Sequence, residues 1–186
     1  MKELSLNILD IIENSAAAKA GRIKLAVTEN KKLDTLDITV EDDGSGMPDG
    51  FAAKATDPFT TTKNARKFGL GLPLLKEETE AAGGYLEIKS SPGKGTAVTA
   101  RIIKSHIDRP PMGDLAATVS TAIAIHPEIH FVFNYAAESG SFSADSEELK
   151  QLFAPVPLNS PSVIRGIEEY LRANIESIDG RKDGKN

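Results

Sequence analysis

The first residues of the chain alternate between apolar and polar positions with the period of a helix. The spacing predicts an amphipathic helix over residues 3–20, with Gly21 as its C-cap. The polar residues Asn7, Asp10 and Asn14 share one arc of this helix. The opposite arc, which the pattern assigns to the core, consists of Leu4, Ile8, Ile11, Ile12 and Ser15.

The following segments change to the two-residue alternation that is typical of strands. A loop rich in glycine, aspartate and proline separates two pairs of such strands, and a helix follows the loop. This order predicts an α+β fold, a two-layer α/β sandwich with one mixed or antiparallel sheet and helices on one face. The predicted strands are 22–30, 33–41, 85–91 and 95–104, and the predicted helix is 71–82.

A proline-rich segment over 105–113 interrupts this pattern and predicts a boundary between two parts of the chain. Residues 1–105 form the predicted first domain, residues 106–176 a small α+β C-terminal appendage, and residues 177–186 a disordered tail. The helix predicted over 114–125 is apolar enough to dock on a second copy or a partner, but burial in the core is preferred. The other elements predicted here are strands 128–136 and 141–144 and helices 146–153 and 160–175, with Asp145 and Ser160 as N-caps.

Charge and cysteine content narrow the classes of function. The 186 residues carry a formal charge of -5, which argues against a general nucleic-acid or membrane-surface binder. Cysteine is absent, which excludes disulfides, thiolate zinc sites and cysteine nucleophiles. No apolar run is long enough to span a bilayer, and the N-terminal residues lack the pattern of a signal peptide. A cytoplasmic protein without nucleic-acid or membrane partners is therefore expected.

Asp10 and Asn14 lie one turn apart on the first predicted helix, so their side chains point the same way. A carboxylate and an amide oxygen in this arrangement can hold a water and a Mg²⁺ ion, because magnesium prefers hard oxygen ligands. Such pairs also occur on solvated helix faces. The two residues alone leave both interpretations open.

Four glycine- or threonine-containing stretches follow. The glycines of DDGSGMP (42–48) allow positive φ and close approach of a planar ligand, or form a tight turn. FTTTK (59–63) and GLGL (69–72) place hydroxyls, a lysine and free N–H groups before a helix, which suits an anion or an ordinary surface loop. GKGT (93–96) alone predicts only a hairpin. Each signal is modest by itself.

The order of these motifs is distinctive. Over about residues 1–105, the chain resembles the Bergerat-type ATP-binding fold of the GHKL superfamily. The motifs that carry the resemblance are, in order, D-x-x-x-N, D-x-G-x-G, F-T-T-T-K, G-L-G-L and G-x-G-T. That superfamily contains gyrase, heat-shock chaperones, histidine kinases and mismatch-repair ATPases. DPFTTTK and GLGL are most similar to nitrogen-regulator-type sensor kinases, whereas ENSAAAKAG is closer to the mismatch-repair and gyrase versions. The resemblance implies ATP and Mg²⁺ as cofactors.

The resemblance also implies roles for individual residues. Asn14 would coordinate Mg²⁺, and Asp10 stands where many relatives place a glutamate general base. Lys63 would contact the phosphates and is the second catalytic candidate, while Asp42 would bind the adenine amine. The other implied nucleotide-binding residues are Gly44, Gly46 and Met47 near the base, Phe59 as lid anchor, Thr61, Thr62, Gly69, Leu70, Gly71 and Leu72 near the phosphates, and Thr96 at the adenine end.

Some residues depart from the family pattern. Asp10 is one methylene shorter than the usual glutamate, and a misplacement of about 1 Å can cost a hundredfold in rate. Ala17 stands where kinases usually carry a basic residue. The chain starts at the asparagine helix and has no histidine before His106, so the hairpin that carries a kinase's phosphoacceptor histidine is expected to be absent. His106 itself is interpreted as a linker residue.

The expected function is that of a Mg-ATP-binding regulatory protein, a kinase or ATPase that transfers phosphate to, or controls, an unidentified protein partner. The alternative is a switch in which ATP or ADP occupancy changes partner affinity with little turnover. A domain that has lost nucleotide binding is disfavoured, because Asn14, Asp42 and the glycines are retained. A homodimer is also compatible with the sequence.

Overall fold

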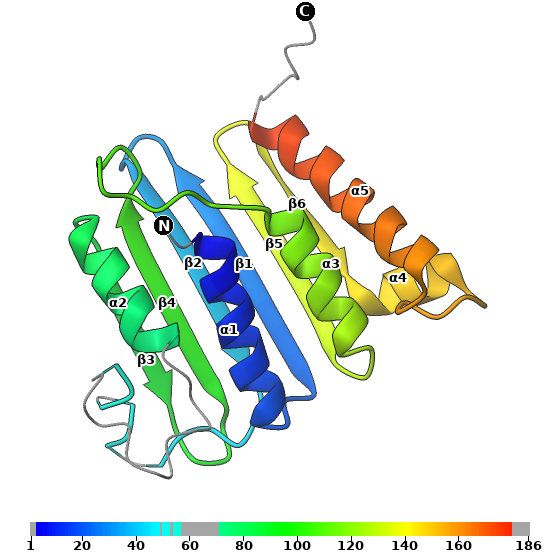
Figure 1. Ribbon diagram of the computed structural model, residues 1–186, viewed down its shortest axis with the longest axis horizontal. Coiled ribbons are helices and arrows are strands. Elements are labelled where there is room, and N and C mark those ends of the chain that lie inside the picture. Colours follow the sequence, from blue (N-terminus) through cyan, green and yellow to red (C-terminus); the bar gives the residue numbers. More distant parts are fainter. Residues whose placement is uncertain (1–2, 49, 53, 57–70, 180–186) are drawn as a thin grey trace, which may run out of the picture.

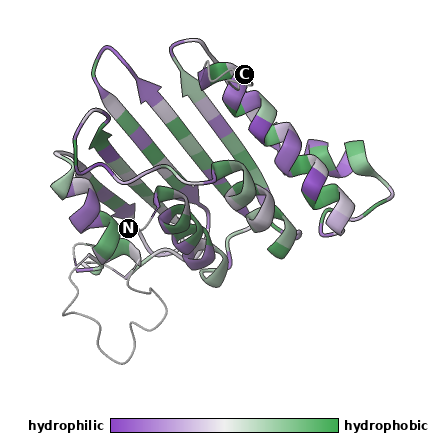
Figure 2. Ribbon diagram, turned by 45° about the horizontal axis from the view of Figure 1, so that its top comes forward, coloured by the Kyte–Doolittle hydropathy of each residue, from purple (hydrophilic) through white to green (hydrophobic). Residues whose placement is uncertain are grey.

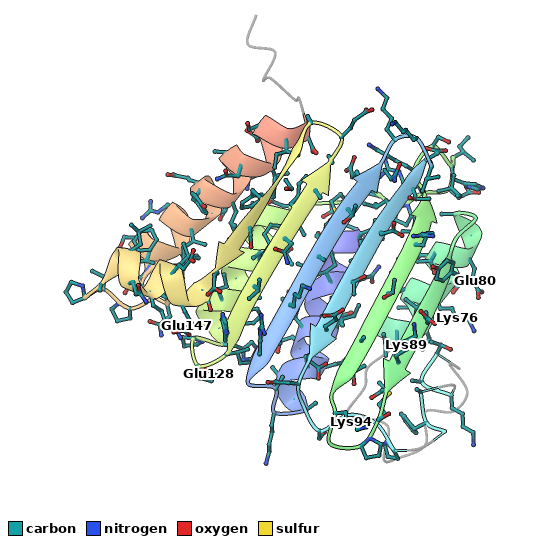
Figure 3. All side chains as sticks on the ribbon, turned by 180° about the vertical axis from the view of Figure 1, so that it is seen from behind. Lys76, Glu80, Lys89, Lys94, Glu128 and Glu147 are labelled. Carbon is teal, nitrogen blue, oxygen red and sulfur yellow. The ribbon has the colours of Figure 1, made fainter. Side chains whose placement is uncertain are left out.

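A six-stranded sheet and a layer of helices build the protein. The computed structural model describes residues 3–48, 50–52, 54–56 and 71–179. The strands have the order β3-β4-β2-β1-β5-β6, and helices α1, α2, α3 and α5 lie against one face of the sheet (Figure 1). From behind, the strands are seen without a covering layer (Figure 3). This arrangement confirms the predicted α+β sandwich with helices on one face.

The elements follow one another as helix, strand pair, helix, strand pair and then the C-terminal helices and strands. Their bounds are α1 (Leu4–Ala17), β1 (Arg22–Asn30), β2 (Thr35–Asp42), α2 (Gly71–Ala81), β3 (Tyr85–Ser90), β4 (Thr96–Ile103), α3 (Leu115–Ile125), β5 (His130–Ala137), β6 (Gly140–Asp145), α4 (Ser146–Phe153) and α5 (Pro161–Asp179). Among the described helices, none offers the long apolar stretch that a bilayer crossing requires.

The sheet is mixed, because one strand pair runs parallel. β1 pairs antiparallel with β2 and parallel with β5, so that Arg22 lies opposite His130. One hydrophobic core runs beneath both halves of the sheet and includes Ile23 of β1, Phe133 of β5 and Ile167 of α5. The predicted domain boundary at residue 105 stays a prediction, although the sheet and the core continue across it.

Helix α3 belongs to this core. It packs against α1 on one side and α5 on the other (Figure 1), and Ala122 at its centre is fully buried. This packing confirms the preferred interpretation of its apolar sequence. At its start, the Asp114 carboxylate accepts a hydrogen bond from the Ala117 N–H, as an N-cap does. Asp145 caps α4 in the same way, as predicted.

Each strand alternates between buried apolar and more exposed polar positions, which Figure 2 shows as alternating colours along the sheet. On the uncovered face the polar side chains pair with one another across strands. The Arg101 guanidinium donates to both carboxylate oxygens of Asp37 at 2.5 and 3.1 Å. The sheet therefore presents a polar surface on this side and needs no second helix layer.

The predicted end of the first helix is wrong. The helix stops at Ala17, and Lys19 rather than Gly21 takes the positive φ, at 60°. Gly21 does not cap the helix because its N–H donates to the Asp43 carboxylate at 2.7 Å. That bond, and a second from Arg22 N–H to the same oxygen, turns the chain into β1.

Asn7 lies on the predicted polar arc of this helix, yet it is buried. The residue is 1% exposed, and its side-chain amide donates to the Glu78 carboxylate of α2 at 2.6 Å. Helix α2 packs on this side of α1 and covers the position. Periodicity within one helix cannot reveal a neighbour that comes seventy residues later in the chain.

Two C-terminal bounds also differ from the prediction. β5 begins at His130 rather than 128, because the Ile129 N–H donates to the His126 carbonyl in a turn. Helix α5 continues to Asp179, beyond the predicted end at 175 and into the predicted tail. Its last buried residue, Ile178, explains the extra turn, since it joins the core.

Candidate functional site

The end of β2 holds the carboxylate that the sequence singled out. Asp42 Oδ1 accepts hydrogen bonds from the Gly44 N–H at 2.9 Å and the Thr96 N–H at 3.3 Å. Its Oδ2 accepts from the Ser15 hydroxyl at 2.7 Å. β2 and β4 are neighbouring antiparallel strands, which brings Thr96 opposite Asp42. The carboxylate is therefore fixed in orientation by three donors from three segments.

The C-terminal half of α1 forms the next wall. Ile11, Asn14 and Ser15 face one hollow from this helix. Asp10 lies one turn before Asn14, and its carboxylate lies near the start of α2, since a Cβ added at Gly71 would lie 3.0 Å from Asp10 Oδ2. The two predicted metal and base residues thus face the side on which α2 begins.

Glycines are required where the loops cross. At Gly46, with φ of 65°, an added Cβ would lie 2.0 Å from the Ser91 carbonyl oxygen. At Gly95, with φ of 79°, it would lie 1.8 Å from the Asp42 carbonyl oxygen. These are backbone atoms and cannot move aside like a flexible side chain. The loop after β2 and the β3–β4 hairpin are consequently interlocked at backbone distance.

The hollow between these segments brings together six of the predicted residues. Among the described residues, its lining consists of Ile11, Asn14, Ser15, Ala18, Asp42, Gly46, Met47, Leu72, Thr96 and Val98. Gly44 and Gly71 adjoin it through their contacts with Asp42 and Asp10. The remaining predicted residues lie outside the described residues: Phe59, Thr61, Thr62, Lys63, Gly69 and Leu70.

Sequence reasoning missed two residues that organise this site. Ser15 was counted with the apolar arc, but its hydroxyl orients Asp42. Ser90, the last residue of β3, contacts the Met47 N–H, the Gly95 carbonyl and the Thr96 hydroxyl. In the sequence, Ser15 stands out only because it follows Asn14, and Ser90 only because it comes shortly before the PGKG turn. Neither position points to a role at the site in a single sequence.

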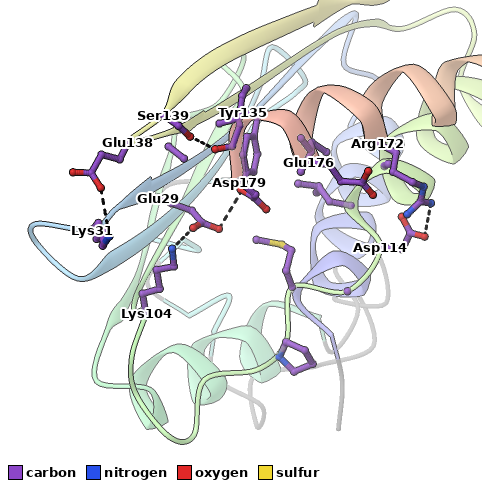
Figure 4. Close-up of a pocket in the computed structure, with 18 of the residues that line it drawn as sticks. Glu29, Lys31, Lys104, Asp114, Tyr135, Glu138, Ser139, Arg172, Glu176 and Asp179 are labelled. Atoms are coloured by element: carbon purple, nitrogen blue, oxygen red, sulfur yellow. Dashed lines mark hydrogen bonds and ion pairs between the residues drawn. The ribbon is translucent and has the colours of Figure 1, made fainter. Parts of the chain in front are cut away.

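A larger hollow, of about 910 Å³, lies at the opposite end of the sheet (Figure 4). Among the residues that the structure describes, none of the predicted site residues lines it. Several of its polar groups contact one another: Lys104 pairs with Glu29, and the Tyr135 hydroxyl donates to Asp179 and Glu29. Burial, and then the hydrogen bond to Asp179, raise the pKa of Tyr135 far above its usual range. This hollow is lined by residues of both α5 and the sheet, and it is not the predicted site.

The comparison with known families decides how the smaller hollow is interpreted. A family described as histidine kinase-, DNA gyrase B- and HSP90-like ATPases matches residues 1–106. The chain belongs to this family. The match covers every described residue of the smaller hollow, from Ile11 to Val98.

Sensor kinases are among the relatives of this ATPase-family chain. The sensor histidine kinase YxdK of Bacillus subtilis (strain 168) is 35% identical over 104 residues, which cover 52% of this chain and 31% of that protein. The sensor protein kinase FleS of Pseudomonas aeruginosa is 36% identical over 92 residues, which cover 50% of this chain and 23% of that protein. The chain thus spans about a third or less of the length of these relatives.

A solved structure shares the fold over a longer stretch. The crystal structure of the N-terminal domain of a DNA repair protein covers 78% of this chain and 52% of that chain, with a TM-score of 0.51 and 14% identity. At this identity the likeness concerns the fold alone.

Proposed function

We propose that the chain is a Mg-ATP-binding regulatory protein that transfers phosphate to, or controls, a protein partner. One observation carries the proposal: Asn14 of α1, Asp42 of β2 and Thr96 of β4 line a single hollow. An oriented carboxylate at one end and an amide oxygen at the other suit an amine-bearing base and a metal-bound phosphate chain, respectively. The named sensor kinases among the relatives support the kinase class.

The residues present fit a magnesium ion. Asn14 and Asp10 offer an amide oxygen and a carboxylate one turn apart on α1. Magnesium in nucleotide sites is held by one or two protein oxygens, together with waters and phosphates. Asn14 would hold the ion, which would neutralise phosphate charge when bound. Asp10 would orient a water or hydroxyl from the same side.

Nucleotide binding is tested first by thermal unfolding with ATP and Mg²⁺. A ligand at a hundred times its Kd stabilises the folded state by about 2.7 kcal/mol, so the melting temperature of the wild-type protein should rise by several degrees. Asp42→Asn and Asn14→Ala should lose most of this shift. The control is Asn134→Ala, at a half-buried position of β5 outside the residues that line the hollow, which should keep it. No shift in the wild-type protein would refute the proposal.

Turnover is tested by phosphate release and by transfer of labelled phosphate to candidate partner proteins. The kinase or ATPase predicts turnover that Asp10→Asn lowers by about two orders of magnitude, the range of a general base. The control is Asp108→Asn, an exposed aspartate after β4. ATP binding without turnover, equal in wild type and Asp10→Asn, would instead assign a nucleotide-dependent switch that acts by partner affinity. A cytoplasmic location and a homodimer stay predictions.

A further inference from the structure

The hydroxyl of Ser90 has three partners but only one proton. The Met47 N–H donates to it at 2.8 Å, and the Gly95 carbonyl oxygen lies at 3.0 Å. A carbonyl can only accept, so the one arrangement in which all three contacts are hydrogen bonds has the Ser90 hydroxyl donate to the Gly95 carbonyl oxygen. The Ser90 oxygen is then left with lone pairs only, one of which takes the Met47 N–H.

This assignment fixes the direction of the remaining contact. The Ser90 and Thr96 hydroxyl oxygens lie 2.9 Å apart, which requires a proton between them. In the arrangement that makes all three contacts hydrogen bonds, the Ser90 proton is already used, so Thr96 is the donor. The Thr96 oxygen therefore offers only lone pairs to the hollow that it lines.

The Asp42 carboxylate beside it is also a hydrogen-bond acceptor, and most of its lone-pair sites are already occupied. An ionised carboxylate has about four lone-pair sites, and the bonds from Gly44, Thr96 and Ser15 occupy three of them. One site remains, on Oδ2. The base end of the hollow thus presents one carboxylate site and the Thr96 oxygen, both of which require an N–H donor.

We propose that Ser90 is a positioning residue that sets this polarity, and that it thereby restricts the site to bases with an exocyclic amino group. The inference rests on the proposed nucleotide site. Ser90 does not line the hollow and acts only through Thr96 and Met47. A 6-oxopurine would place a carbonyl oxygen against two acceptors, which leaves both sides without a hydrogen bond.

The test compares affinity for ATP with affinity for inosine triphosphate, which carries an oxygen in place of the amino group. Wild type should bind ATP more tightly. In Ser90→Ala the Thr96 proton loses its acceptor and can turn toward the base, so the preference for ATP should fall about threefold to tenfold. Ser90→Thr keeps the hydroxyl and should keep the preference. The control is Ser45→Ala, an exposed serine in the loop after β2.

A merely structural role for Ser90 would weaken both nucleotides by the same factor, and an unchanged ratio in Ser90→Ala would overturn the inference alone. A wild-type protein that binds neither nucleotide would overturn the proposed function as well. Should Ser90→Ala not fold, a second variant is available. Thr96→Val removes the hydroxyl oxygen that would accept a hydrogen bond from the base, and it leaves Ser90 in place. Its ATP preference should fall in the same range, and an unchanged preference would again overturn the inference.

Discussion

Alanine at Gly46 tests the interlocked loops directly. The residue has φ of 65°, and an added Cβ would lie 2.0 Å from the Ser91 carbonyl oxygen and 2.8 Å from its carbon. The left-handed conformation costs a non-glycine residue about 1–2 kcal/mol, and forced overpacking adds about 1–3 kcal/mol. Gly46→Ala should therefore lower the free energy of unfolding by about 2–5 kcal/mol, a large part of the stability of a small protein.

Gly93 supplies the matched control. Its φ of 72° imposes the same backbone cost, but an added Cβ there meets no atom within 4 Å. Gly93→Ala should lose only about 1–2 kcal/mol. Urea titrations followed by circular dichroism measure both variants, and the m-value should stay constant if only stability changes. Equal losses at the two positions would show that φ alone matters and that the close approach of the loops is not real.

Three further predictions concern the core and the C-terminal half. Because the pKa of Tyr135 is raised above its ordinary 10.0, the folded protein keeps a proton that the unfolded chain releases, so stability is intact below pH 10 and falls above it. Urea titrations across that range should show a decline steeper by up to about 1.4 kcal/mol per pH unit in wild type than in Tyr135→Phe; parallel declines would contradict this. Ile167→Ala empties a fully buried site and should cost about 2–5 kcal/mol, against less than about 0.5 kcal/mol for Leu152→Ala, which is 74% exposed. Ser146→Ala leaves the buried Phe131 N–H without its 2.9 Å acceptor and should cost about 1–3 kcal/mol in the same assay, whereas a neutral result would mean that water replaces the hydroxyl.

Local patterns were enough to predict most elements and the general order of the site. The alternation of RIKLAVTEN predicted β1 over the residues that the structure shows, and the asparagine helix and glycine motifs lie around one hollow. These features depend on residues a few positions apart, which a single sequence displays.

The features that were missed depend on residues far apart in the chain. Asn7 is buried by Glu78 of α2, and Ser15 turns inward to reach Asp42. Ser90 is invisible as a motif, because its importance comes from three backbone and hydroxyl partners in two different loops. The sequence pattern predicted β5 as a strand, but it did not predict that this strand pairs with β1, which lies far away in the chain.

That pairing has a consequence for how the protein is made. β1 is an inner strand of the finished sheet, yet its partner β5 leaves the ribosome about a hundred residues later, which is about 5–20 s at usual rates of synthesis. During this interval the outer hydrogen-bonding groups of β1 are an open edge, of the kind that recruits other extended chains. The growing polypeptide is thus exposed to misassociation after β1–β4 have been made and before β5 and β6 have joined the sheet.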